Sequence, residues 1–330
     1  MQQKEAAEVE IIKLLKAARS GFISGQSISN GLGISRTAIW KHIKNLREMG
    51  YSIEASPSKG YRLADIAKAH FNEIEVSYNL STEFVGRKIY FYPEIDSTNI
   101  KAFELGRSAA PEGTVIIADT QAKGKGRIGR KWESPAGVNL YTSVILRPDI
   151  PPQSAHNLTF VSAVAVAEAI SLYSPVRPVV KWPNDILLDS KKVAGILMEM
   201  DSEIDRVHFV IAGIGVNLNM TEAMLPDFLR PIATSVCEKK GGAVNRAEFA
   251  GCLYASIEKW YKIYLDQGFT PVLDEWKRYF GSEGKRVRVV SFTNTFEGIC
   301  MGVDSDGALL VKNSKGVVER VISGDVETLR

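Results

Sequence analysis

The stretch best suited to binding a charged ligand is Gly124-Lys-Gly-Arg-Ile-Gly-Arg-Lys-Trp132, which holds three glycines, four cations and one indole in nine residues. Glycine lets backbone N–H groups approach a ligand closely, and guanidinium and ammonium groups attract anions. The indole offers a flat face on which an aromatic ring can stack. This basic loop is therefore predicted to bind a ligand that is anionic at one end and aromatic at the other, as a nucleotide is.

The spacing of the loop also matches G-x-G-x-x-G, but its surroundings do not fit a dinucleotide-binding fingerprint. That fingerprint follows a strand and opens a helix. Residues 114–118 do predict a strand, but Trp132–Gly137 is rich in turn residues and residues 139–146 predict another strand. The Gly-rich loop of kinases has this order, yet the other kinase motifs and a Walker A sequence are missing. A basic surface hairpin without a ligand is the remaining alternative.

A second cluster of polar residues consists of Lys181-Trp-Pro-Asn-Asp185 and Lys191-Lys-Val-Ala-Gly195. Pro183 interrupts a strand pattern, so the chain must turn where these polar side chains lie. The following segments predict a hairpin whose loop contains Asp189-Ser190. Its lysines and short polar side chains could converge beside the basic loop. The spacing leaves three roles open for Asp185: binding Mg²⁺, orienting a lysine, or capping a turn.

A third cluster, Asp96-Ser-Thr-Asn99, follows a predicted strand at residues 88–92. The hydroxyls of Ser97 and Thr98 both donate and accept hydrogen bonds, which suits a polar but neutral group of a ligand. The alternative is an N-cap for a helix over residues 99–105. The two roles are compatible.

Length and composition limit the classes of protein to consider. A chain of 330 residues is predicted to hold two or three domains of about 100–200 residues each. No apolar run approaches the ~20 residues of a membrane span, and charged residues near the N-terminus argue against a signal peptide. The three cysteines are far apart and the four histidines are scattered. We therefore expect a cytoplasmic protein with no disulfide framework and no protein-bound metal site.

The first 64 residues predict a winged helix-turn-helix. Helical periodicity over residues 9–17 is followed by a short helix capped by Ser24, a turn at Gly33 and a longer helix capped by Ser35. Two short strands follow, at residues 51–55 and 60–63.

The charge of this segment supports DNA as its partner. It carries ten basic and five acidic residues, a net charge of +5, whereas the whole chain carries +3. In a winged helix the early residues of the last helix reach base edges and phosphates. The residues predicted to contact DNA are Ser35, Arg36, Thr37, Trp40 and Lys41. A basic protein-interaction domain is the alternative.

The rest of the chain is predicted to form a linker and two further domains. A polar, helical linker is expected at residues 65–82, and alternating strands and helices indicate a mixed α/β-sheet domain at residues 83–277. Short alternating strands at residues 278–330 predict a small β-barrel or sandwich, with Asp304–Gly307 as a hairpin turn. The fold class is thus multidomain α+β.

In this order, the motifs resemble those of the bifunctional biotin–protein ligases, which also repress biotin operons. The resemblance is carried by Asp96–Asn99, Gln121 with the basic loop, Lys181–Asp185, Lys191–Gly195 and Gly213-Ile-Gly-Val-Asn217. It extends over essentially the whole chain, including the winged helix. It implies a central sheet like that of class II aminoacyl-tRNA synthetases and an SH3-like C-terminal barrel.

The resemblance implies a reaction in two steps. The carboxylate of biotin attacks the α-phosphorus of ATP, supplied with Mg²⁺, to give biotinoyl-adenylate and pyrophosphate. A lysine of biotin carboxyl carrier protein then attacks the mixed anhydride. Pressing two anions together requires fixed cations more than a nucleophile, and no Cys or Ser nucleophile beside a base is evident.

The resemblance also implies the roles of individual residues. Ser97, Thr98 and Gln121 would bind the ureido ring, and Lys192 would stabilise the charge that develops at the reacting centre. The implied catalytic residues are Lys181, Lys192 and Arg127. The implied biotin-binding residues are Ser97, Thr98, Asn99, Gln121, Gly124, Lys125, Arg127, Lys192 and Gly195. The implied ATP- and adenylate-binding residues are Arg127, Gly129, Trp132, Asn184, Asp185, Lys192 and Asn217.

The basic loop departs from the family's commonest Gly-Arg-Gly-Arg-Arg-Gly at Lys125 and Ile128. Lys125 keeps the charge, whereas Ile128 loses one, so position 128 is assigned no ligand contact. Expected partners are the carrier domain of acetyl-CoA carboxylase, with pyruvate carboxylase as a further candidate, operator DNA, and a second copy of the chain when the adenylate is bound. No membrane is expected to be a partner. Two alternatives stay open: a lipoate–protein ligase, and a transcription factor that senses a metabolite without converting it.

Overall fold

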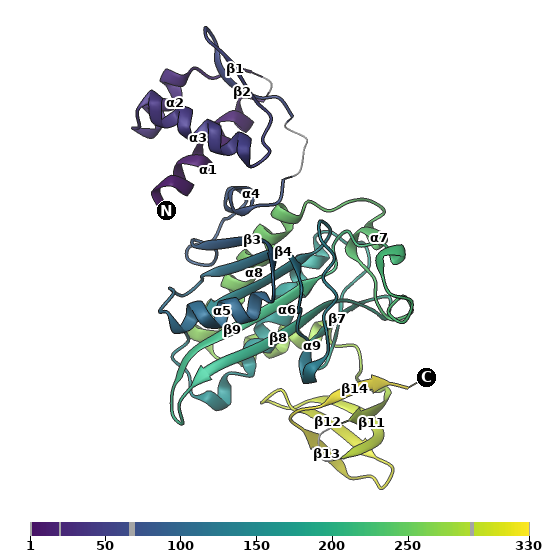
Figure 1. Cartoon of the computed structure of the whole chain (residues 1–330). Coiled ribbons are helices and arrows are strands. Elements are labelled where there is room, and N and C mark those ends of the chain that lie inside the picture. The colour runs from purple at the N-terminus through teal and green to yellow at the C-terminus, as the bar shows by residue number, and fades with distance from the viewer. Residues whose placement is uncertain (1, 20, 66–69, 291–293, 330) are drawn as a thin grey trace. The chain divides into compact units, whose positions relative to one another are not determined.

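The computed structural model describes residues 2–19, 21–65, 70–290 and 294–329, which form two compact units, residues 1–80 and 81–330 (Figure 1). Among the described residues, no helix is both long and apolar enough to cross a membrane. Each unit has its own buried core.

The N-terminal unit has the helices and strands that the sequence predicts for a winged helix-turn-helix. They are α1 (Gln2–Ala17), α2 (Gly25–Leu32), α3 (Arg36–Glu48), β1 (Ile53–Ser56) and β2 (Gly60–Leu63). A further helix, α4 (Glu73–Tyr78), follows them and was not predicted as part of this domain. Ser24 and Ser35 accept hydrogen bonds from backbone N–H groups in the first turns of α2 and α3, which confirms both as N-caps. The turn between the helices uses the left-handed conformation of Gly33. Apolar side chains of all three helices form the core, among them Ile12, Leu15, Ile28, Ile39, Ile43 and Leu46.

Helix α4 lies in the stretch predicted to be a linker, and it packs against α1. The buried carboxylate of Glu75 accepts hydrogen bonds from Lys16 Nζ at 2.6 Å and from the Tyr51 hydroxyl at 3.1 Å. This part of the predicted linker therefore belongs to the N-terminal unit. Residues 66–69 of the linker lie outside the described residues, and the domain boundaries stay a prediction.

The central sheet has seven strands in the order β3-β4-β5-β9-β8-β7-β6. Its strands are β3 (Ile89–Ile95), β4 (Val115–Gln121), β5 (Leu140–Leu146), β6 (Val179–Lys181), β7 (Asp185–Leu188), β8 (Lys191–Ser202) and β9 (Val207–Val216). The β3–β4 pair is parallel and the others are antiparallel, so the predicted mixed sheet is confirmed. Both β3 and β4 run three residues further than predicted, because Ile95 still pairs with Gln121. Asp96–Asn99 therefore follows directly at the end of β3.

Helices cover both faces of this sheet. They are α5 (Thr98–Arg107), α6 (Asn157–Ser171), α8 (Arg246–Gln267) and α9 (Thr270–Tyr279), and the short helix α7 (Val236–Lys240) lies between β9 and α8 in the chain. Adjacent residues of a strand point to opposite faces. On β5, Ser143 contacts Asn99 of α5, whereas Thr142 contacts Tyr254 of α8. Helices α5 and α8 therefore lie on opposite faces, and α6 packs with α8 and α9.

The C-terminal part of this unit is a sheet of five antiparallel strands in the order β13-β12-β11-β10-β14. They are β10 (Arg286–Val290), β11 (Thr295–Val303), β12 (Leu309–Asn313), β13 (Val318–Val321) and β14 (Asp325–Thr328). The carboxylate of Asp304 accepts bonds from the N–H groups of Asp306 and Ala308, which confirms the predicted hairpin turn. The carbonyl of Gly307 in this turn accepts a bond from Trp182 Nε1 at 3.0 Å. The turn is thereby tied to the Lys181–Asp185 segment.

Candidate functional site

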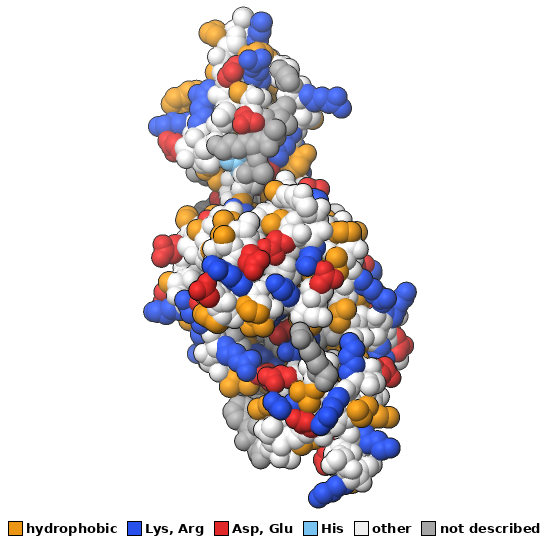
Figure 2. All heavy atoms as spheres, turned by 90° about the vertical axis from the view of Figure 1, so that its right-hand side faces the viewer, with side chains coloured by type: hydrophobic (Ala, Val, Ile, Leu, Met, Phe, Trp, Pro, Cys, Tyr) orange, Lys and Arg blue, Asp and Glu red, His pale blue; other side chains and the backbone are white. Residues whose placement is uncertain are grey.

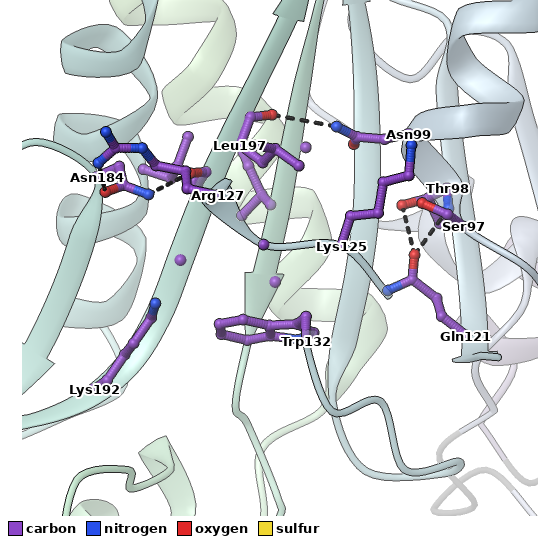
Figure 3. Close-up of a pocket in the computed structure, with 16 residues that line it drawn as sticks. Ser97, Thr98, Asn99, Gln121, Lys125, Arg127, Trp132, Asn184, Lys192 and Leu197 are labelled. Carbon is purple, nitrogen blue, oxygen red and sulfur yellow. Dashed lines mark hydrogen bonds between the residues drawn. The ribbon is translucent and has the colours of Figure 1, made fainter. Parts of the chain in front are cut away.

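A cavity lies on the face of the central sheet that carries α5 (Figure 3). It brings together ten residues that the sequence had assigned to ligand binding: Ser97, Thr98, Asn99, Gln121, Lys125, Arg127, Trp132, Asn184, Lys192 and Gly195. Segments up to about 100 residues apart thus meet in one place, a convergence that the sequence allowed but could not show. Six further lining residues had been given no individual role: Gly126 of the basic loop, Gly213, Ile214 and Gly215 of the Gly213–Asn217 motif, and Ile196 and Leu197, which sequence reasoning missed.

The floor of the cavity is free of side chains at three glycines. Gly195 on β8 lies opposite Gly215 on β9, and Gly213 is two residues earlier on β9. A Cβ atom at Gly213 would lie 2.0 Å from Asn99 Oδ1, and one at Gly215 would lie 2.6 Å from the Trp132 ring. Any side chain at these positions would displace the groups above it. The alternation Gly213-x-Gly215 in a strand was the sequence signal that could have revealed this floor.

At one end of the cavity, Ser97, Thr98 and Gln121 form a polar patch without charge, here called the uncharged end, and the side chain of Lys125 lies beside it (Figure 3). Gln121 Oε1 accepts hydrogen bonds from the backbone N–H of Thr98 at 2.8 Å and from its hydroxyl at 3.1 Å (Figure 3). Ser97 stands at the N-cap position of α5, but its side chain makes no capping bond. The capping alternative for Ser97 is therefore not realised, and Ser97 lines the cavity instead.

The opposite end is cationic. Arg127 donates from Nη1 to Asn184 Oδ1 at 3.0 Å, and its Nη2 donates to the carbonyl of Gly324 at 3.3 Å. Lys192 Nζ lies 2.7 Å from a carboxylate oxygen of Asp185. Of the three roles left open for Asp185, the structure thus shows the orientation of a lysine. Each cation is held by a partner in a fixed position, as charge stabilisation requires.

The basic loop connects β4 to β5 without a helix of more than one turn, as predicted. Its tip is the short 3-10 turn Arg127–Gly129, in which Ile128 has a φ of +54°. Asp325 of β14 forms ion pairs with Arg127, at 3.7 Å, and with Arg130. The C-terminal sheet thus contributes an acidic residue to the cationic end, a contact that no sequence pattern indicated.

Trp132 places its indole on the glycine floor. Its ring lies against Gly195 and Gly215, and Lys192 Nζ is 5.2 Å from the ring centroid. Its Nε1 is buried and finds no hydrogen-bond partner among the described residues. This indole lies between the uncharged and cationic ends, as Figure 3 shows.

Five predicted site residues do not line the cavity: Gly124, Gly129, Lys181, Asp185 and Asn217. Asp185 acts on the lining through Lys192. The buried amide of Asn217 is engaged by Asn139 and by the carbonyl of Thr234. The structure neither confirms nor contradicts the roles of these residues in binding or catalysis. Among the described residues, no three His, Cys, Asp or Glu side chains gather into a metal site.

The predicted DNA-contacting residues share the exposed face of α3: Ser35, Arg36, Thr37, Trp40 and Lys41 are all exposed. Trp40 leaves 55% of its surface accessible although the other face of α3 is buried. Lys and Arg side chains are spread over the N-terminal unit in Figure 2, with fewer acidic ones between them. An exposed aromatic side chain among basic residues is typical of a surface that binds nucleic acid.

Three family models match the chain in the order of its domains. An HTH domain matches residues 9–62, the biotin/lipoate A/B protein ligase family matches residues 91–217, and the biotin protein ligase C terminal domain matches residues 284–328.

Characterised relatives match along nearly the whole chain. The bifunctional ligase/repressor BirA of Bacillus spizizenii is 42% identical over 318 residues, which cover 96% of this chain and 97% of the relative. BirA of Escherichia coli is 30% identical over 317 residues, which cover 96% of each chain. A structure of biotin protein ligase from Aquifex aeolicus in complex with biotin and ATP superposes with a TM-score of 0.64 and 27% identity, covering 74% of this chain and 99% of that one.

Proposed function

This chain belongs to the family of bifunctional biotin protein ligases and repressors, and on that premise we propose how its cavity performs the reaction. Biotin and ATP are the substrates. The ureido ring of biotin lies at the uncharged end, at Ser97, Thr98 and Gln121, and the carboxylate meets the α-phosphate at the cationic end. The observation that supports this placement is the lining of the cavity, which joins Ser97, Thr98 and Gln121 at one end to Arg127 and Lys192 at the other.

The cations act on the adenylation step. The carboxylate oxygen of biotin attacks the α-phosphorus, and the bond to pyrophosphate breaks. Arg127 and Lys192 lower the repulsion between the two anions and stabilise the charge that develops, because Asn184 and Asp185 already hold them in place. Mg²⁺ enters as part of the MgATP substrate. Lys181 is proposed to assist adenylation, and Trp132 and Asn217 to form the adenosine side.

Biotin is then transferred to a lysine of the carrier protein. The lysine amine attacks the acyl carbon of biotinoyl-adenylate, an amide forms, and AMP leaves. We propose the carrier domain of acetyl-CoA carboxylase as acceptor, with pyruvate carboxylase as a second one, in the cytoplasm. The SH3-like form of the C-terminal sheet and the synthetase-like form of the central sheet are part of the same proposal.

Label exchange between pyrophosphate and ATP tests the site. We expect exchange with biotin and MgATP, and none with lipoate or without an acid. Exchange that depended on lipoate would show that the protein is a lipoate–protein ligase instead. A folded protein without exchange under any condition would contradict the enzyme and favour a sensor.

The repressor function requires the exposed face of α3 and, we propose, a dimer. Strand β7 pairs only with residues 191–195 of β8. From Leu197 to Ser202, β8 pairs with β9 on one side, and on its other side the described residues place no strand. This open edge can pair with the same edge of a second copy. Biotinoyl-adenylate would favour that dimer and thereby operator binding. When biotin and MgATP are added, sedimentation should show the dimer and a gel mobility shift should show tighter operator binding. A DNA affinity that did not change with biotin would contradict the proposal.

A further inference from the structure

We propose that Glu199, which lies next to the cavity lining, fixes Thr98 as a hydrogen-bond acceptor for a ring N–H of the ligand. Gly195, Leu197 and Glu199 alternate along β8 and therefore share the face that carries the cavity. Glu199 is thus a positioning residue, which acts through Asn99. This inference rests on the proposed biotin site.

The first step is the orientation of the Asn99 amide. Asn99 Nδ2 lies 2.7 Å from a carboxylate oxygen of Glu199 and 3.4 Å from the carbonyl of Leu197 (Figure 3 shows the latter contact). Both partners can only accept, so the NH₂ group must face them. The carbonyl oxygen of the Asn99 amide therefore faces Ser143.

The second step is the direction of the hydroxyl protons. Ser143 Oγ lies 2.7 Å from Asn99 Oδ1 and 2.8 Å from Thr98 Oγ1, and Ser143 is fully buried. Asn99 Oδ1 can only accept, so the single proton of Ser143 goes to it. Ser143 then offers Thr98 only a lone pair, and Thr98 must donate its own proton to Ser143 or to Gln121 Oε1.

The consequence is a chemical preference at the uncharged end. With its proton directed into the protein, the Thr98 hydroxyl presents a lone pair to the cavity. A lone pair suits the N–H of a ureido ring and offers nothing to the sulfur ring of lipoate. Sites built around such a hydrogen bond discriminate strongly against analogues that lack it, because the buried group is left unpaired.

Substitutions at Glu199 test this chain of bonds by titration calorimetry with biotin and by exchange kinetics. Glu199→Gln removes the charge that imposes the orientation, and Glu199→Lys supplies a donor that reverses it. We expect the biotin Kd to rise about tenfold in E199Q and about a hundredfold in E199K. The KM for ATP and the kcat at saturating biotin should stay within about twofold, which general structural damage would not spare.

Asp201 supplies the matched control, because it is the next carboxylate on the same face of β8 and pairs instead with Arg107 of α5. Asp201→Asn and Asp201→Lys should leave biotin affinity unchanged. In a Ser143→Ala background, which interrupts the chain, E199Q should add less than about twofold.

The outcomes separate this inference from the function on which it rests. A folded wild-type protein that bound no biotin would refute the proposed function. Wild-type binding with equal affinity in E199Q and E199K would overturn the role of Glu199 alone. The role of Glu199 would also be overturned if E199Q raised the biotin Kd by the same factor in the S143A background as in the wild type.

Discussion

At the scale of single residues, the site contains two kinds of residue. Some carry functional groups in motifs that can be recognised in the sequence, and others give no such signal. Cations, hydroxyls and an indole in short motifs could be predicted from the sequence, as Arg127, Thr98 and Trp132 were. Ser143 could not, since a lone serine in an apolar strand is ordinary. Gly213 was recognised only as part of a motif, because glycine carries no functional group to suggest its place in the floor. Their roles depend on the residues that they contact, and those contacts are set by the pairing of β5 with β9.

The glycine floor gives the first prediction at this scale. In Gly213→Ala the new Cβ atom would overlap Asn99 Oδ1 at 2.0 Å, so Asn99 must leave its bonds to Ser143 and Glu199. We expect the biotin Kd to rise by at least about tenfold, as calorimetry would measure. Gly242→Ala, which meets no atom within 4 Å, is the control and should bind biotin normally.

A second prediction concerns the charge at the reacting centre. Lys192→Met removes the ammonium group that Asp185 holds, and the exchange rate should fall by about a hundredfold to a thousandfold, typical of losing one stabilising donor. Lys191→Met is the control, because its Nζ bonds to the carbonyl of Arg230 on the other side of the strand. Equal losses in both variants would argue against a specific role for Lys192.

At the scale of elements, local patterns predicted most helices and strands, including both N-caps of the helix-turn-helix. The ends of β3 and β4 were predicted too short, because their last residues, Glu94 and Thr120 among them, pair across a parallel ladder that the local pattern does not reveal. A contact between residues far apart in the sequence also holds the first residues of the second unit in place. Glu258 on α8 accepts hydrogen bonds from three successive N–H groups, those of Glu83, Phe84 and Val85.

Glu258 therefore gives a prediction about stability and pH. Burial raises the pKa of this carboxyl, but the three N–H bonds and Lys262 lower it more, so the net pKa is below 4.5. A carboxyl with a lowered pKa in the folded state stabilises the fold above its unfolded pKa and loses that contribution as the pH falls through its folded pKa. Glu258→Gln should lower the free energy of unfolding by about 1–3 kcal/mol at pH 7.

Urea unfolding of wild type and E258Q between pH 7 and pH 3 measures this contribution. The difference between the two proteins should shrink as the pH falls below 4.5. A difference that stayed constant over this range would mean that the charge of Glu258 contributes nothing. Glu104→Gln, at an exposed position on α5, serves as control and should have little effect.

At the scale of the whole molecule, function is divided between the two compact units. The N-terminal unit holds the face that we propose contacts DNA, while the cavity and the C-terminal sheet lie within residues 81–330. The order of domains could be predicted from the sequence because each has its own periodicity and charge. The contact of Asp325 with the basic loop could not, since it joins residues almost 200 positions apart.

This division predicts that removal of residues 1–80 separates the activities. The truncated protein should keep biotin-dependent exchange within about twofold, because a compact unit has its own core. Operator binding should be lost entirely in a mobility-shift assay. Trp40→Ala in the full chain should weaken DNA binding and leave exchange intact. Loss of exchange in W40A would contradict the division.

The indole of Trp132 has one more consequence, for the optical properties of the protein. It sits on the floor where the ligand must lie, and its buried N–H has no partner among the described residues. The other four tryptophans lie outside the cavity lining. When biotin or its adenylate binds, the surroundings of Trp132 therefore change most, and we expect a shift in intrinsic fluorescence that reports occupancy. The protein thus carries its own label for stopped-flow measurement of biotin binding and of adenylate formation.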